Sequence, residues 1–142
     1  MNVSRQSGSS VRTLIVCIVI HLILDTQTGI AQLPYLLRGR RPPPETWDEE
    51  ADIVATLNYS APPCAVCFGG AFGDDDIEAM RAATKDVRSD AVWLKVDADK
   101  PKPNVAEDPV AYGKHMVSRA KDALRKALGD ESEEWKGKIM LY

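Results

Sequence analysis

Two of the three cysteines in the chain, Cys64 and Cys67, form a C-x-x-C pair that is followed at once by a glycine-rich turn. Such a pair does redox chemistry when it begins a helix, because the helix N-terminus lowers the thiol pKa, and it holds zinc when a second pair of ligands is present. Here the pair falls at the entrance of the apolar run 65–68, whose length and flanking prolines and glycines are typical of a buried strand. Residues three apart on a strand point to opposite faces, so the two sulfur atoms are expected to diverge. The spacing predicts buried structural cysteines, with redox chemistry as the alternative.

The turn that follows, GGAFG at 69–73, is the place where a ligand would be expected. In a parallel sheet, ligands gather beyond the carboxyl ends of the strands, and glycines let the backbone approach them closely. The turn is not G-x-G-x-x-G, however, and the three aspartates after it would repel a pyrophosphate. The turn is therefore either an ordinary tight turn or, if a ligand binds, part of a predicted crevice formed by Gly69, Gly70, Phe72, Asp97 and Tyr112, whose cofactor or ligand the residues do not specify.

A pair of acidic residues, Asp97 and Asp99, follows the next apolar run at 91–96. With Asp74–Asp76 they offer oxygen ligands of the kind that Mg²⁺ prefers. A strand followed by D-x-D resembles the first motif of haloacid-dehalogenase-type phosphohydrolases, in which the first aspartate is the nucleophile. The acidic motifs stand in reversed order here, and the serine or threonine motif is missing. Asp97 and Asp99 are instead expected to begin a turn, and no metal site is predicted.

The elements that must position these residues alternate regularly beyond residue 45. Thr46 and Glu49 form a capping box, and Asp108-Pro109 and Gly129 mark the two ends of a long helix. The predicted elements are a helix at 46–58, a strand at 65–68, a helix from 74, a strand at 91–96, a helix at 109–129 and a strand at 138–142. This order predicts an α/β fold, a small three-layer Rossmann-like domain with a short parallel sheet.

Residues 1–31 form an apolar N-terminal segment with two interpretations. Basic residues precede an apolar run from Leu14 to Leu24, and Gly29-Ile30-Ala31 follows, as in a secretory signal peptide. The run is shorter than the about 20 residues that cross a membrane, and its β-branched residues equally suit a buried strand. The segment is therefore either a signal peptide or anchor, with membrane association only through 11–24, or an extra strand of a cytoplasmic protein. His21, within this run, is not expected to be a ligand.

The remaining organisation follows from composition. Residues 32–45, with Arg40-Arg41 and three consecutive prolines, are predicted to be an extended linker, and 46–142 the α/β domain. The net charge of −3 and the 6% content of aromatic residues argue against a nucleic-acid surface. A three-stranded sheet has exposed edges, which favours a homodimer as one kind of assembly.

Three segments, CFGGAFGDDDIEAMRAA, WLKVDADKPKP and YGKHMVSRAKDALRKAL, resemble a group of small uncharacterised fungal proteins with Rossmann-like or flavodoxin-like architecture. The resemblance covers roughly residues 45–142 and implies an accessory role beside metabolic genes, with no catalytic residue carried over. We therefore expect an accessory module, linked to fungal secondary metabolism, that binds a small molecule or a protein partner. The alternatives are a nucleotide-cofactor-dependent oxidoreductase, a Mg-dependent phosphohydrolase and a secreted protein.

Overall fold

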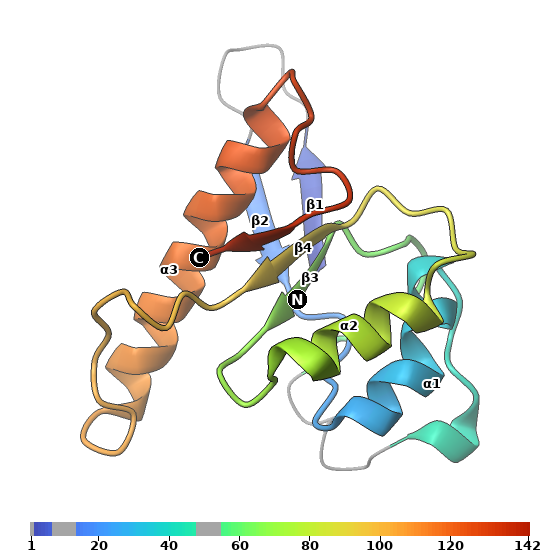
Figure 1. Ribbon diagram of the computed structural model, residues 1–142, viewed down its shortest axis with the longest axis horizontal. Helices are drawn as coiled ribbons and strands as arrows, with labels where there is room; N and C mark the ends of the chain where they lie inside the picture. The colour runs from blue at the N-terminus through green and yellow to red at the C-terminus, as the bar shows by residue number, and fades with distance from the viewer. Residues whose placement is uncertain (1, 7–13, 48–54) are drawn as a thin grey trace.

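The computed structural model describes residues 2–6, 14–47 and 55–142 and has an α/β architecture (Figure 1). Its elements are β1 (Asn2–Gln6), β2 (Leu14–Ile18), α1 (Thr26–Leu37), the 3-10 turn η1 (Pro44–Thr46), β3 (Ala65–Phe68), α2 (Asp74–Ala83), β4 (Val92–Lys95), α3 (Pro109–Gly129) and β5 (Ile139–Leu141). Strands β3, β4 and β5 form a parallel open sheet in that order. Helix α3 packs on one face of the sheet and α1 and α2 pack on the other. The predicted small three-layer α/β fold with a short parallel sheet is confirmed.

The sheet strands alternate between the two faces with the period of two expected for extended chain. Along β4, Val92 and Leu94 pack toward α3, whereas Trp93 packs on the side of α1 and α2. Along β3, Ala65 lies in the α3 cluster and Phe68 in the other. Both faces of the sheet are therefore covered, as parallel strands require.

Helix α3 begins where the sequence predicts, because Asp108 caps it and Pro109 occupies its first turn. The Asp108 carboxylate accepts a hydrogen bond from the Ala111 N–H at 2.9 Å, which satisfies one of the unpaired amides of the helix start. The helix buries its small and aliphatic side chains against the sheet, namely Ala120, Ala123, Leu124 and Ala127. Alanines at this contact let the helix axis approach the sheet closely.

Helices α1 and α2 are tied together at their N-termini and along their contact. Asp76, in the first turn of α2, accepts hydrogen bonds from the Gly73 N–H at 2.9 Å and from the Thr26 hydroxyl of α1 at 2.9 Å. These two bonds, the Gly73 bond first, hold the pKa of the Asp76 carboxyl below its usual range. Further along, Gly29 of α1 lies against Met80 of α2, and a Cβ at residue 29 would overlap the Met80 sulfur. Glycine at this position permits the close approach of the two helices.

The N-terminal segment contains β1 and β2, which pair antiparallel as a separate hairpin, followed by the start of α1. Ile20, Leu33, Leu36 and Leu37 are buried, so this part of the chain contributes to the core. Helix α1 runs across residue 31, where the sequence analysis placed a boundary between an apolar segment and a linker. The chain from 19 to 37 therefore packs with the α/β elements.

The segment expected to be a linker packs back onto α1. Pro42 is fully buried, and its carbonyl accepts a hydrogen bond from the Trp47 indole N–H at 3.0 Å. The helix predicted at 46–58 falls largely on residues 48–54, which lie outside the described residues. Residues 55–59 have no regular secondary structure. Within the described parts of the chain, no helix combines the length and the apolar character needed to cross a membrane.

Candidate functional site

The five residues of the predicted crevice come from three places in the structure. Gly69 and Gly70 form the exposed turn after β3, and Asp97 follows β4. Phe72 packs on the α1/α2 side of the sheet, with its ring 5.7 Å from that of Phe68. Tyr112 lies in the first turns of α3, which covers the opposite face. Of these residues, Phe72 lines the cavity described below.

Asp97 is held by hydrogen bonds that shape the chain after β4. Its carboxylate accepts from the Asp99 N–H at 3.0 Å, and its own N–H donates to the Tyr142 carbonyl at 2.7 Å. The first bond is the local aspartate turn that the sequence predicts. Asp74, in the other acidic motif, forms an ion pair with Lys95. Among the residues that the structure describes, no group of three or more histidine, cysteine or acidic side chains is placed to hold a metal ion.

Tyr142, the residue after β5, is buried on the α3 side of the sheet. Its hydroxyl donates to the Phe68 carbonyl at 3.2 Å, and its own carbonyl accepts from the Arg119 guanidinium at 2.6 Å. Burial, with smaller contributions from Cys67 and Tyr112, raises the pKa of Tyr142 to about 12. The hydroxyl therefore stays protonated and acts as a structural donor.

The two cysteines of the C-x-x-C pair are half-buried and pack against the same cluster, on the α3 face. The strand prediction for 65–68 is confirmed, but the expectation that the two side chains point to opposite faces is wrong. The physical reason is that Cys64 precedes β3, where the strict alternation of a strand does not apply. Cys67 lies within the strand and follows that alternation. The pair thus begins a strand and not a helix, unlike a thioredoxin-type site.

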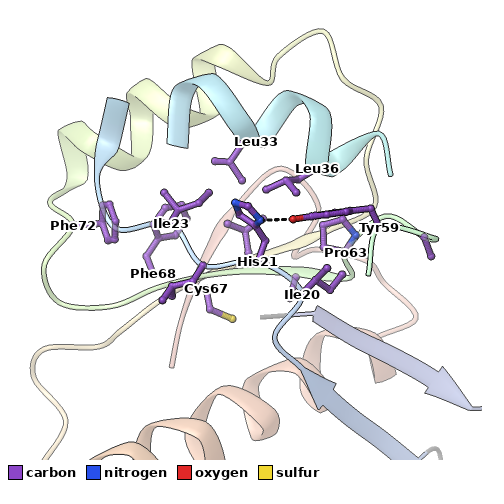
Figure 2. Close-up of a pocket in the computed structure, with 14 residues that line it drawn as sticks. Ile20, His21, Ile23, Leu33, Leu36, Tyr59, Pro63, Cys67, Phe68 and Phe72 are labelled. Atoms are coloured by element: carbon purple, nitrogen blue, oxygen red, sulfur yellow. Dashed lines mark hydrogen bonds between the residues drawn. The ribbon is translucent and has the colours of Figure 1, made fainter. Parts of the chain in front are cut away.

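A cavity of about 100 Å³ lies on the other side of β3, between this strand and α1 (Figure 2). Its walls come from the segment leading into α1, from α1 itself and from β3, and include Ile20, Leu33, Leu36 and Phe68. Each of these four side chains is less than a tenth exposed. His21 and Tyr59 are the polar side chains among the described residues that line the cavity. Cys67 also lines it, although its side chain packs on the α3 face.

His21 forms the polar part of the cavity wall. Its Nδ1 lies 2.8 Å from the Tyr59 hydroxyl, and its Nε2 lies 2.7 Å from Oε1 of the buried Gln32. Figure 2 shows the imidazole between Leu33 and the β3 side of the cavity, with the Tyr59 hydroxyl directed at it. The chain of hydrogen bonds continues beyond Gln32, whose amide nitrogen lies 2.7 Å from the Thr46 carbonyl. We call the linked residues His21, Tyr59, Gln32 and Thr46 the polar relay.

The relay is anchored by the segment that was predicted to be a linker. The Thr46 hydroxyl donates to the Pro43 carbonyl at 2.6 Å. Next to it, the Trp47 ring lies edge-on to His21, with ring centres 6.3 Å apart, and carries the Arg41 guanidinium over its outer face at 4.3 Å. This segment therefore fixes the position of Gln32, and through Gln32 the orientation of His21.

His21 is not expected to be a ligand from the sequence, but the structure places it at the centre of the site. Its partners Gln32 and Tyr59 stand 11 and 38 positions away in the sequence. The one available signal was a polar, hydrogen-bonding side chain within an apolar run, since such a residue needs a partner when it is buried.

The arrangement combines apolar walls with one oriented polar side chain. Both nitrogen atoms of His21 take part in hydrogen bonds that orient it, so the imidazole positions Tyr59. The apolar walls favour an uncharged molecule, because an ion would lose its hydration without compensation.

Comparison with known proteins gives one informative similarity. A curated protein of Aspergillus oryzae, named Kojic acid related protein 6, is 30% identical to the chain over 107 residues. The match covers 75% of this chain, and the chain spans about 60% of the length of that relative. No protein-family model and no solved structure matches the chain. The comparisons thus support the resemblance to fungal proteins and identify no Rossmann-like family.

Proposed function

We propose that the protein is a non-catalytic accessory module of fungal secondary metabolism that binds a small, mostly apolar molecule between α1 and β3. The proposal rests on the cavity of about 100 Å³, with its buried apolar walls and its single polar side formed by the relay. An apolar pocket with a few convergent polar groups is the usual form of a small-molecule site.

The geometry supports binding more than it supports chemistry on the ligand. His21 is held between Gln32 and Tyr59, and Gln32 is held in turn by Thr46, so the polar side is fixed before a ligand arrives. A site that is already ordered costs little conformational entropy on binding. The magnesium-dependent alternative has less support, because the Asp97 carboxylate accepts from a backbone amide and Asp74 pairs with Lys95.

The metabolic part of the proposal comes from the similarity to the Aspergillus oryzae protein. The name of that relative connects it with kojic acid. We infer that this chain serves a related branch of fungal metabolism, as its resemblance to small fungal proteins also implies.

The proposal is tested by thermal unfolding with uncharged single-ring compounds such as phenol and benzyl alcohol, with NAD(P), FMN and Mg²⁺ alongside. Ring compounds are expected to raise the melting temperature saturably, since a ligand at 100 times its Kd stabilises by about 2.7 kcal/mol. The nucleotides and Mg²⁺ should leave the melting temperature unchanged.

A pair of variants locates the binding. Leu36→Phe fills the cavity and should abolish the shift, whereas Leu141→Phe, on a side chain 55% exposed in β5, should leave it intact. An absence of any shift with the ring compounds, or an equal shift in Leu36→Phe, contradicts the proposal.

A further inference from the structure

Strand β5 is one edge of the parallel sheet, since the strand order is β3-β4-β5 and no other strand of the described chain pairs with it (Figure 1). Tyr142 bonds to the inner side of this edge: its N–H donates to the Lys95 carbonyl at 2.9 Å, and its carbonyl accepts from the Asp97 N–H at 2.7 Å. Successive residues of a strand direct their main-chain polar groups to alternate sides. The N–H and carbonyl groups of Leu141 therefore point away from β4, toward the open edge.

A groove of about 620 Å³ lies beside this edge, between β5 and α3. Met140, Leu141 and Tyr142 form its strand side. The charged side chains that line it are Lys100, Arg119, Asp122, Arg125 and Lys126. Four of these five are basic, although the whole chain has a net charge of −3. Positive charge is therefore concentrated along this edge of the sheet.

Most of this positive charge has no acidic partner within the described chain. Arg125 pairs with Asp122 at 2.9 Å, which is the acidic side chain of the groove. The Arg119 guanidinium donates to two main-chain carbonyls, at 3.1 and 2.6 Å, rather than to a carboxylate. Lys100 and Lys126 form no ion pair with a described residue. The groove thus offers positive charge to a negatively charged partner.

An extended segment of another protein would complete the edge, because its main chain supplies the hydrogen-bond partners that Leu141 lacks. Strand addition of this kind gains affinity from main-chain bonds and specificity from side chains. A second copy of this chain fits less well. Antiparallel pairing of two β5 edges would set the two α3 helices side by side and bring like charges together, which disfavours the pairing.

We infer that the groove between β5 and α3 is a docking site for an acidic, extended segment of a partner protein, which adds a strand to the sheet at Leu141. Alternate residues of the segment face α3, and their carboxylates pair with Lys100 and Lys126. The site borders the α3 face of the sheet, whereas the proposed ligand cavity lies between β3 and α1, so the inference does not depend on that cavity.

The test titrates the full chain with a peptide of about eight residues in which glutamate and valine alternate, a length typical of strands. NMR is expected to show saturable binding at β5 and α3, and hydrogen exchange of the Leu141 amide should become slower. The control peptide has lysine in place of glutamate and should not bind. No binding of the glutamate peptide, or equal binding of the lysine peptide, overturns the inference.

Methylated peptides distinguish strand addition from simple charge attraction. Methylating the valine amides and methylating the glutamate amides blocks opposite edges of the same peptide, because alternate residues direct their N–H groups to opposite sides. One form is expected to lose binding and the other to keep it. Retention by both forms, or loss by both, overturns strand addition. A single-stranded oligonucleotide that binds the groove as tightly as the glutamate peptide also overturns it.

Two charge variants locate the binding. Lys126→Glu, exposed near the end of α3, should weaken binding of the glutamate peptide roughly five-fold, since an attraction becomes a repulsion. Lys85→Glu makes the same change at an exposed position just beyond α2, outside the groove, and should leave the affinity within about two-fold. An equal loss in the two variants contradicts the assignment of the groove.

Sedimentation and amide exchange of the protein alone test the competing occupant, a second copy of the chain. We expect the Leu141 amide to exchange rapidly when no peptide is present. A dimer in which this amide is protected would show that the edge is already occupied, and would overturn the inference.

Discussion

The two faces of the parallel sheet are packed in different ways. On the α3 face, Val92, Leu94 and Leu124 are at most 1% exposed, and alanines bring the helix close. On the α1/α2 face, the rings of Phe68 and Trp93 stack at 5.7 Å, and the buried Gln32 belongs to a hydrogen-bonded relay beside a cavity. The comparison indicates that the α3 face contributes stability through close packing, whereas the α1/α2 face leaves a cavity of about 100 Å³ beside β3.

The largest expected effect on stability comes from truncating a leucine to alanine, and its size should differ between the two faces. Leu124→Ala should lower the free energy of unfolding by about 3–5 kcal/mol, because the close-packed surroundings cannot collapse into the space. Leu36→Ala, beside the existing cavity, should cost only about 2–3 kcal/mol, since Leu36 already lacks neighbours on one side. Urea denaturation measures both changes in the free energy of unfolding, provided that the m-value is the same in the wild type and the two variants. An equal or larger cost for Leu36→Ala would contradict the distinction between the faces.

Replacing a glycine by alanine is expected to lower the stability of the protein in α1 and to raise it in α3. Gly29→Ala places a methyl group against the buried Met80 and should destabilise the protein by about 1–3 kcal/mol, in spite of the better helix propensity of alanine. Gly113→Ala in α3 meets no atom within 4 Å and should stabilise it by about 0.5–1 kcal/mol. Thermal melts of the two variants measure the difference. Stabilisation by Gly29→Ala would show that α1 and α2 can separate without cost.

The smallest expected effect is the contribution of the buried Tyr142, on the α3 face, to stability at high pH. The pKa of Tyr142 rises from 10.0 to about 12 on folding, so the unfolded chain loses this proton first as the pH increases. The contribution of Tyr142 to stability is therefore complete below pH 10 and is lost as the pH rises through about 12. Tyr142→Phe should lose less stability than the wild type as the pH rises over this interval. Denaturant unfolding of both proteins at a series of pH values measures the difference. An identical slope in the variant would mean that other groups cause the loss.

The elements on the α3 side were predictable because their signals are local. Asp108 and Pro109 begin α3 with a side-chain cap and a proline in the first turn, and the apolar run at 65–68 is bounded by prolines and glycines. Parallel pairing of the strands then follows from the rule that alternating helices and strands form parallel crossovers. None of these inferences needs a contact between distant residues.

The site was not predictable, because its signals are distant in the sequence and weak locally. Helix α1 contains Gly29 and an internal Pro34 and has no acidic residue in its first turn, so propensity alone does not indicate a helix. It is held instead by packing against α2. His21 gains its meaning from Gln32 and Tyr59, which only the folded chain brings within hydrogen-bond distance.

The packing of residues 19–37 into the core also has a consequence for maturation. A protease that trimmed the chain after Ala31 would take away Ile20, His21 and the glycine that lies against Met80. The remnant would expose the Met80 side of α2 to water and would lack the lining residues Ile20, His21, Leu22 and Ile23. Cleavage after Ala31 would therefore dismantle one side of the cavity.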